Sequence, residues 1–160
     1  MLIKRGMIGL EKLLPKFIDC FCCGNENTKG LNINYYFKGN KVYADFIADK
    51  EYLISENILH PGIAMGVLFE AMSWLVSYTL GHSMVLVDFN VRVLKPATTC
   101  TKLSVIAEAI SINRWVSEVC GTLKNEDGNI CFKAIGKFTY RTTNDEHINN
   151  FLHTYDREPL

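Results

Sequence analysis

Two residues in the most apolar stretch of the chain could carry out acid–base chemistry. The stretch LHPGIAMGVLFEAMSW, residues 59–74, holds a single carboxylate, Glu70, ten residues after His60. A carboxylate in such surroundings can act as a general base or as a nucleophile toward an activated carbonyl. A buried carboxylate is also costly unless it is paired or hydrogen-bonded. The alternative is therefore structural, with Glu70 bonded to a backbone group, to a tyrosine or to His60 across an interface.

Other polar side chains near Glu70 could complete a site. Ser73 and Ser77 follow it by three and seven residues, so a helix would place all three on roughly one face. Ser73 together with Glu70 could hold a hydrolytic water. Asn57 precedes His60 in the same loop and could orient a water there. A lone histidine before a helix more often positions the loop than touches substrate, and both roles stay open for His60.

The cysteines offer a second kind of chemistry. Cys20, Cys22 and Cys23 form a cluster that could supply half of a zinc site. The other three cysteines stand singly in strand-like runs, and no second Cys-x-x-Cys or His-x-x-x-His pair completes a ligand set. We therefore expect reduced thiols, as in a cytoplasmic protein, and no metal site.

One long helix must position Glu70. Apolar residues recur on overlapping helical rows from Gly62 to about Leu80, nearly all round the helix, which predicts that protein encloses it on most sides. Gly81 is expected to end this helix. Strand-like runs flank it on both sides, at residues 31–37, 41–48, 84–96, 102–112, 114–124 and 129–141.

Three further segments carry specific expectations. Along 84–96, alternate residues are apolar, so Phe89 and the valines of that row are expected to form one buried face. A short amphipathic helix is expected at residues 8–18. Residues 49–61 are polar and are expected to be irregular.

Composition excludes several classes of function. The chain has 160 residues with 17 basic and 17 acidic side chains, so it lacks the basic excess typical of a nucleic-acid partner. Charged residues interrupt the N-terminal apolar residues too often for a secretory signal. No run approaches the roughly 18 uncharged apolar residues of a membrane span. We expect a cytoplasmic protein with neither a nucleic-acid nor a membrane partner.

The order of elements predicts an α+β fold. Two strands, one long apolar helix and four more strands would bury their apolar surface if a six-stranded antiparallel sheet wrapped around the helix. The expected organisation is an N-terminal helical extension over residues 1–19, a domain over 20–141 and a polar tail over 142–160.

Five short motifs, in the same order, resemble those of the hotdog-fold acyl-CoA thioesterase superfamily, in its phenylacetyl-CoA thioesterase-like branch. That branch has Cys-x-x-Cys-Gly-x-x-Asn-x-x-Gly-Leu before its first strand, and His-Gly-Gly at the start of a helix that continues to Leu-Asp-Glu-Ala-Met. The matching stretches are CFCCGNENTKGL (20–31), HPGIAMGVLFEAM (60–72), DFNVRVLKP (88–96), NEDGN (125–129) and AIGKF (134–138).

The resemblance implies a catalytic apparatus that this chain has altered. In the family, the first glycine after the histidine resembles an oxyanion donor, and an acidic residue nine positions after the histidine performs the chemistry. Here Pro61, which has no N–H, replaces that glycine, and Phe69 replaces the acid. Gly62 could substitute as donor. Glu70 is one residue too late, which turns a helical side chain by about 100°.

Two functions remain open on these grounds. The first is hydrolysis of an acyl-CoA or acyl-carrier-protein thioester at a dimer-interface site, with Glu70 and His60 as catalytic residues. The second is a non-catalytic acyl-thioester binding or sensing protein that has lost the usual carboxylate and oxyanion glycine. CoA would be part of the substrate, with no separate cofactor. Basic residues at strand ends, Arg92 and Lys95, are candidates for its phosphates. The resemblance also implies a homodimer or a dimer of dimers.

Overall fold

A computed structural model describes residues 11–140 of the chain. One α-helix and nine β-strands make up this part, together with one short 3₁₀ turn, η1. Their bounds are β1 Lys12–Leu13, β2 Tyr36–Lys38, β3 Lys41–Ile47, η1 Lys50–Tyr52, β4 Leu53–Ser55, β5 Ile58–Leu59, α1 Pro61–Leu80, β6 Val85–Val93, β7 Lys102–Ser111, β8 Val116–Lys124 and β9 Ile130–Thr139.

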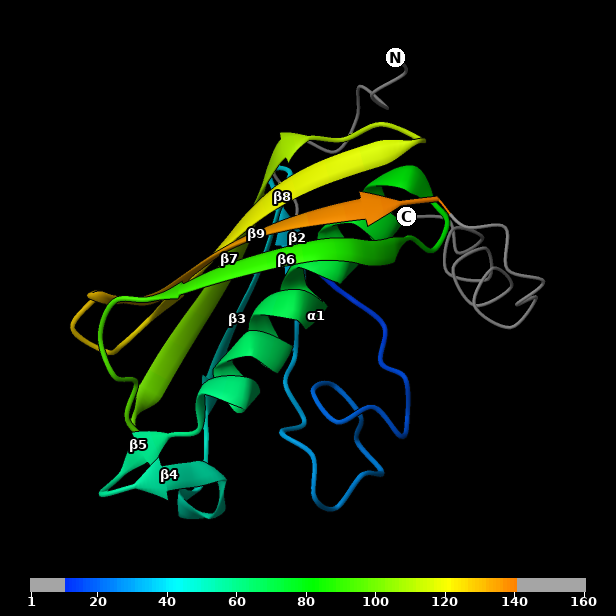
Figure 1. The fold of residues 1–160 in the computed structure, drawn as a ribbon. Coiled ribbons are helices and arrows are strands. Elements are labelled where there is room, and N and C mark those ends of the chain that lie inside the picture. Colours follow the sequence, from blue (N-terminus) through cyan, green and yellow to red (C-terminus); the bar gives the residue numbers. More distant parts are fainter. Residues whose placement is uncertain (1–10, 141–160) are drawn as a thin grey trace.

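Seven of the strands form one antiparallel sheet in the order β1-β2-β3-β7-β8-β9-β6. The sheet curves around α1, which lies mainly against β7 and β8 (Figure 1). This confirms the α+β hotdog architecture. The sheet has seven strands rather than the expected six because the two-residue β1 adds to the edge formed by β2.

The apolar composition of α1 follows from its burial beneath the sheet. Ala64, Leu68, Met72 and Leu75 are fully buried beneath the sheet. Gly81 adopts the left-handed conformation, with φ of 72°, and its N–H caps the carbonyl of Ser77, so the predicted helix end is confirmed. By length and mean hydropathy α1 could also cross a membrane, but burial in the core accounts for the same composition.

Two glycines in the sheet let α1 approach closely. A Cβ placed at Gly121 in β8 would lie 2.9 Å from Sδ of Met72, and one at Gly136 in β9 would lie 2.8 Å from Cε of the same side chain. The thioether of Met72 therefore occupies space that only glycine leaves open on these two strands.

The N-terminal segment differs from the prediction. Within the described residues, the expected helix at 8–18 is wrong: Lys12 and Leu13 pair with β2 as a strand, and residues 8–10 lie outside the described part. Pro15 is one physical reason, because proline disrupts a helix interior.

The segment after β1 lies beside α1 (Figure 1). The buried hydroxyl of Tyr35 donates to the carbonyl of Val67 on α1 at 3.3 Å. The loop also pairs with itself, since the N–H of Ile33 donates to the carbonyl of Cys22. The N–H of Leu31 donates to Phe21, and the carbonyl of Tyr35 accepts from Leu14, so this stretch bonds to the preceding segment. Of the run predicted as a strand at 31–37, only Tyr36 and Phe37 belong to β2.

The strand after the helix is also less buried than predicted. β6 is an edge strand with a register shift between Leu86 and Asp88, so the row of alternate residues does not stay on one face. Val87 and Val93 are 60% and 54% exposed. The expected continuous buried face is therefore wrong. Residues 49–61, expected to be irregular, contain η1 and the β4–β5 hairpin.

Candidate functional site

The start of α1 is fully hydrogen-bonded. Pro61 is the first helical residue and contributes no N–H. The N–H of Gly62 donates to Nδ1 of His60 at 3.0 Å, so the histidine is the N-cap of the helix. The N–H groups of Ile63 and Ala64 both donate to the carbonyl of His60. Every donor that could stabilise an oxyanion in this turn already has an acceptor.

Phe69 and Glu70 differ sharply in their surroundings. Phe69, at the position where the resemblance places an acid, is 37% exposed. Glu70 instead faces the N-terminal segment, where Sγ of Cys20 donates to its Oε1 at 3.5 Å and Nε1 of Trp74 donates to the same oxygen at 3.3 Å. The structural alternative predicted a backbone group, a tyrosine or His60 as the partner; the partners are a thiol and an indole.

Glu70 lies in a cluster of acidic groups. Sγ of Cys20, Sγ of Cys23 and a carboxylate oxygen of Glu70 all lie within 4.8 Å of one another. Cys23 is buried, whereas Cys20 and Glu70 are partly buried. In the sequence, the cysteines and Glu70 are separate candidate features. The spacing Cys-x-x-Cys was visible, but nothing in the sequence indicated that the loop folds against the middle of α1.

Proximity and burial change the acidity of these groups. Burial raises the pKa of Glu70 to about 7. The hydrogen bond from Cys23 lowers the pKa of Cys20 to about 5, against the effect of burial. The pKa of Cys23 is raised, first by that same bond and then by burial. Burial raises the pKa of Cys22 to about 12.

A small cavity of about 150 Å³ opens beside Glu70. Ser73 and Ser77 line it together with Glu70, and their role in holding a water or a substrate stays a prediction. The indole of Trp74 lines it too, and it stacks on Phe17 with ring centroids 5.6 Å apart. The remaining lining residues are Phe17, Ser83 and Met84. The cavity is small for a CoA thioester, though it has room for waters beside the carboxylate.

A larger cavity of about 430 Å³ lies elsewhere, between residues 31–36 and strand β3. Its carboxylate, Asp45, accepts a hydrogen bond from Ser104 and forms a salt bridge with Lys102. The pKa of Asp45 is lowered by those two partners, with burial acting in the opposite direction. A paired carboxylate on the sheet offers little chemistry, so size alone does not identify the candidate site.

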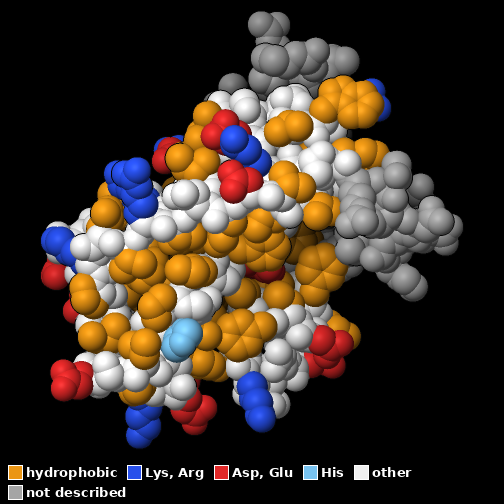
Figure 2. All heavy atoms as spheres, in the orientation of Figure 1, with side chains coloured by type: hydrophobic (Ala, Val, Ile, Leu, Met, Phe, Trp, Pro, Cys, Tyr) orange, Lys and Arg blue, Asp and Glu red, His pale blue; other side chains and the backbone are white. Residues whose placement is uncertain are grey.

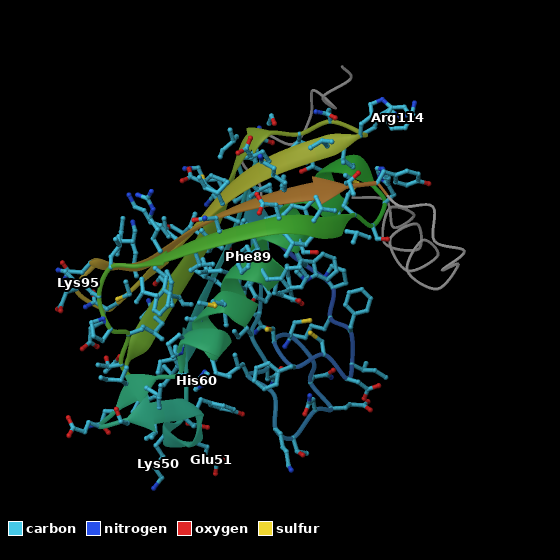
Figure 3. All side chains as sticks on the ribbon, in the orientation of Figure 1. Lys50, Glu51, His60, Phe89, Lys95 and Arg114 are labelled. Atoms are coloured by element: carbon cyan, nitrogen blue, oxygen red, sulfur yellow. The ribbon has the colours of Figure 1, made fainter. Side chains whose placement is uncertain are left out.

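The other predicted site residues are not gathered around Glu70. Asn57 is exposed at the β4–β5 turn with φ of 68°, and its carbonyl accepts bonds from Thr99. Arg92 is exposed on the edge strand β6. Lys95 donates to Asn129 at 3.2 Å, and Figure 3 shows it at one end of the sheet, away from His60 at the start of α1. A CoA-binding role for these three residues stays a prediction.

Comparisons with known proteins bear on the fold. No family model matches the chain, and no curated protein matches it. Among solved structures it resembles a thioesterase superfamily protein with a TM-score of 0.72 at 15% identity, over 77% of this chain and 61% of the other. The chain thus spans less than two thirds of that protein.

Two further solved structures resemble the chain. The Escherichia coli PaaI protein from the phenylacetic acid degradation operon has a TM-score of 0.65 at 13% identity, over 69% of this chain and 80% of that one. A Streptococcus mutans protein bound to acetyl-CoA has a TM-score of 0.62 at 19% identity, over 68% and 87%. The chain therefore has the hotdog fold that these structures share.

Proposed function

We propose that this protein binds an acyl thioester of CoA or of an acyl-carrier protein and does not hydrolyse it. One observation carries the proposal: the first turn of α1 has no free donor, because Pro61 lacks an N–H and His60 accepts the N–H of Gly62. Hydrolysis needs donors aimed at the developing oxyanion, and losing one such donor typically costs about 10²–10³-fold in rate. Phe69, in place of the acid, removes the second requirement.

The ligand class rests on the fold. A neighbour of the same fold is bound to acetyl-CoA, which supports a CoA thioester as the ligand of this chain as well. Fold alone does not determine chemistry, so the ligand has to be tested directly.

Hydrolysis through Glu70 is the second candidate function. A carboxyl whose pKa is raised to about 7 is well matched to general-base catalysis near neutral pH. The adjoining cavity, with Ser73 in its wall, could hold the attacking water. Glu70 is nine residues after Pro61, about 13 Å along the helix axis, so the thioester would have to lie away from the helix start.

One assay separates the two functions. The protein and its Glu70→Gln variant are incubated with acyl-CoAs of several chain lengths and with phenylacetyl-CoA; binding is measured by calorimetry and free CoA by chromatography. The proposal expects binding of at least one thioester with no release of CoA above the rate in buffer. Turnover that disappears in Glu70→Gln would establish the second function instead. Failure to bind any thioester, CoA-linked or carrier-linked, contradicts both.

A double variant, Pro61→Gly with Phe69→Asp, tests the physical reason. It restores an N–H at the helix start and an acid nine residues after His60. We expect measurable thioester hydrolysis to appear, with Phe69→Asp alone remaining inactive. An inactive double variant that still binds the thioester would show that the helix start does not limit the chemistry.

We further propose that two copies associate, as the resemblance implies, and that they meet along β6. β6 is a free sheet edge in the described part of the chain, with Val87, Val93 and Leu94 more than half exposed. Figure 2 shows hydrophobic side chains gathered on this face, over α1 and along β6. An unpaired apolar edge favours strand addition. Light scattering should give twice the monomer mass, and Val87→Lys with Val93→Lys should lower it to one; a monomeric wild type contradicts the proposal.

A further inference from the structure

We propose that Cys20, Cys23 and Glu70 form a binding site for Zn²⁺. Sγ of Cys20, Sγ of Cys23 and a carboxylate oxygen of Glu70 lie within 4.8 Å of one another, two from the N-terminal loop and one from the middle of α1. Thiolate sulfur and carboxylate oxygen are established zinc ligands, and Cys-x-x-Cys is a ligand spacing. The inference does not depend on acyl-thioester binding.

The distance between Cys20 and Glu70 fits tetrahedral coordination. With a Zn–S bond of about 2.3 Å and a Zn–O bond of about 2.1 Å at the tetrahedral angle, the sulfur and oxygen lie about 3.6 Å apart. The distance from Sγ of Cys20 to Oε1 of Glu70 is 3.5 Å. Sγ of Cys23 lies within 4.8 Å of both atoms, so a side-chain adjustment can complete the set around one ion.

The loop is shaped to hold both thiols on one side. The N–H of Gly24 donates to the carbonyl of Cys20 at 2.9 Å, and the N–H of Cys20 donates to the carbonyl of Phe17 at 2.9 Å, which closes two successive tight turns. A Cβ at Gly24 would overlap the carbonyl oxygen of Cys20. Only glycine permits this closure, so the turn that brings the cysteines together is fixed by the sequence.

The electrostatics favour a cation. Each group in the cluster is acidic, and the polar groups that reach Glu70 are thiols and an indole N–H, none of which is positively charged. A divalent cation bound among these three ligand atoms would neutralise the carboxylate of Glu70 and the thiolates that ligate it.

Trp74 supplies an outer contact of the kind that orients metal ligands. Its Nε1 donates to Oε1 of Glu70 at 3.3 Å, and its ring is buried and stacked on Phe17. Such outer partners fix the direction of a ligating carboxylate. Three protein ligands leave a fourth position, which a water from the adjoining cavity can fill.

Metal titration of the full-length, reduced protein tests the site. Zn²⁺ affinity and stoichiometry are measured by competition with a chromophoric chelator, and Co²⁺ replaces Zn²⁺ for absorption spectroscopy. We expect one equivalent of Zn²⁺, thiolate-to-cobalt charge-transfer bands and the d–d bands of four-coordinate Co²⁺. Cys20→Ser and Cys23→Ser should abolish these bands, and Glu70→Gln should weaken binding at least tenfold.

Two control variants test whether Zn²⁺ binds unspecifically to other thiols of the protein. Cys22→Ala removes the thiol between the two ligands, and Cys100→Ser removes an exposed thiol elsewhere; both should bind Zn²⁺ like the wild type. Zn²⁺ should also raise the Tm of the wild type, whereas Mg²⁺ should not, and this measurement does not require a folded variant. The proposal fails if the wild type binds no stoichiometric Zn²⁺, or if Cys20→Ser and Cys23→Ser bind it unchanged.

Discussion

The start of α1 at His60 and its middle around Glu70 differ in how their polar groups are hydrogen-bonded. At the start of α1, the histidine ring and carbonyl accept three successive N–H groups, so the turn is satisfied from within. Around Glu70, two thiols and a carboxyl lie close together, and the indole N–H of Trp74 donates to the carboxyl. The first region is exposed, and its donors are already paired; the second is partly buried, and its sulfur and oxygen atoms are the ligands of the proposed zinc site.

The difference shows that residue type alone does not locate chemistry. His60 and Glu70 were the two candidate acid–base residues of the sequence, but one acts as a helix cap and the other belongs to a cluster built by a distant loop. Which hydrogen bonds a group already makes decides what it can do next.

The largest expected effect on stability comes from removing the side chain of Trp74, which packs beside the Glu70 cluster. Trp74 is 4% exposed, stacks on Phe17 and donates to Glu70, so Trp74→Ala should lower the free energy of unfolding by about 3–5 kcal/mol. Urea unfolding monitored by far-ultraviolet circular dichroism measures the loss.

Trp115 provides the matched control, because its ring is 65% exposed. Trp115→Ala should change the free energy of unfolding by no more than about 0.5 kcal/mol. Equal losses of unfolding free energy in the two variants would mean that Trp74 contributes no more to stability than an exposed ring. The Glu70 cluster would then lack the packing support that distinguishes it from the helix start.

The second largest effect is the change of stability with pH that arises from Glu70. Its pKa rises from 4.5 to about 7 on folding, so the folded state holds the proton more tightly and gains stability that is fully present below about pH 4.5. That stability is lost as the pH rises through about 7. A shift of this size corresponds to roughly 3 kcal/mol.

Glu70→Gln isolates this contribution, because Cys20 is present in both proteins. With a chelator present, the stability of the wild type relative to Glu70→Gln should fall between pH 4.5 and 8, as measured by urea unfolding at several pH values. Parallel stability curves for the two proteins would show that Glu70 does not retain its proton on folding.

The smallest effect is expected at the helix start. His60→Ala removes the acceptor for the N–H of Gly62, and loss of an N-cap typically costs about 1 kcal/mol. His60→Asn, whose side chain can also cap, should recover most of that stability in thermal unfolding. If His60→Ala also changed Zn²⁺ binding, the two regions would not be independent.

The sequence was sufficient for most of the fold. The apolar periodicity of α1, its stop at Gly81 and the alternating strands after it report burial directly, because side chains on those elements follow simple repeats. The resemblance of five ordered motifs then specified the hotdog architecture. The pocket shared by Glu70, Ser73 and Ser77 was also predictable, since all three lie on one helix face.

The rest depended on contacts between distant segments. Nothing local to residues 8–18 indicated that Lys12 and Leu13 would join a sheet edge, and the bulge in β6 has no clear pattern in its alternating valines. The meeting of Cys20 and Cys23 with Glu70 spans about fifty positions of sequence and is set by loop closure. The spacing within a motif identifies candidate metal ligands, but it does not show which helix they will contact.

The closely packed glycines of β8 and β9 also affect the part of α1 that carries Glu70. Met72 follows Glu70 by two residues on α1, and its thioether rests against Gly121 and Gly136. A side chain at either position would displace this thioether, two residues along the helix from Glu70. The packing of α1 beside the cluster therefore depends on two glycines on the opposite side of the helix.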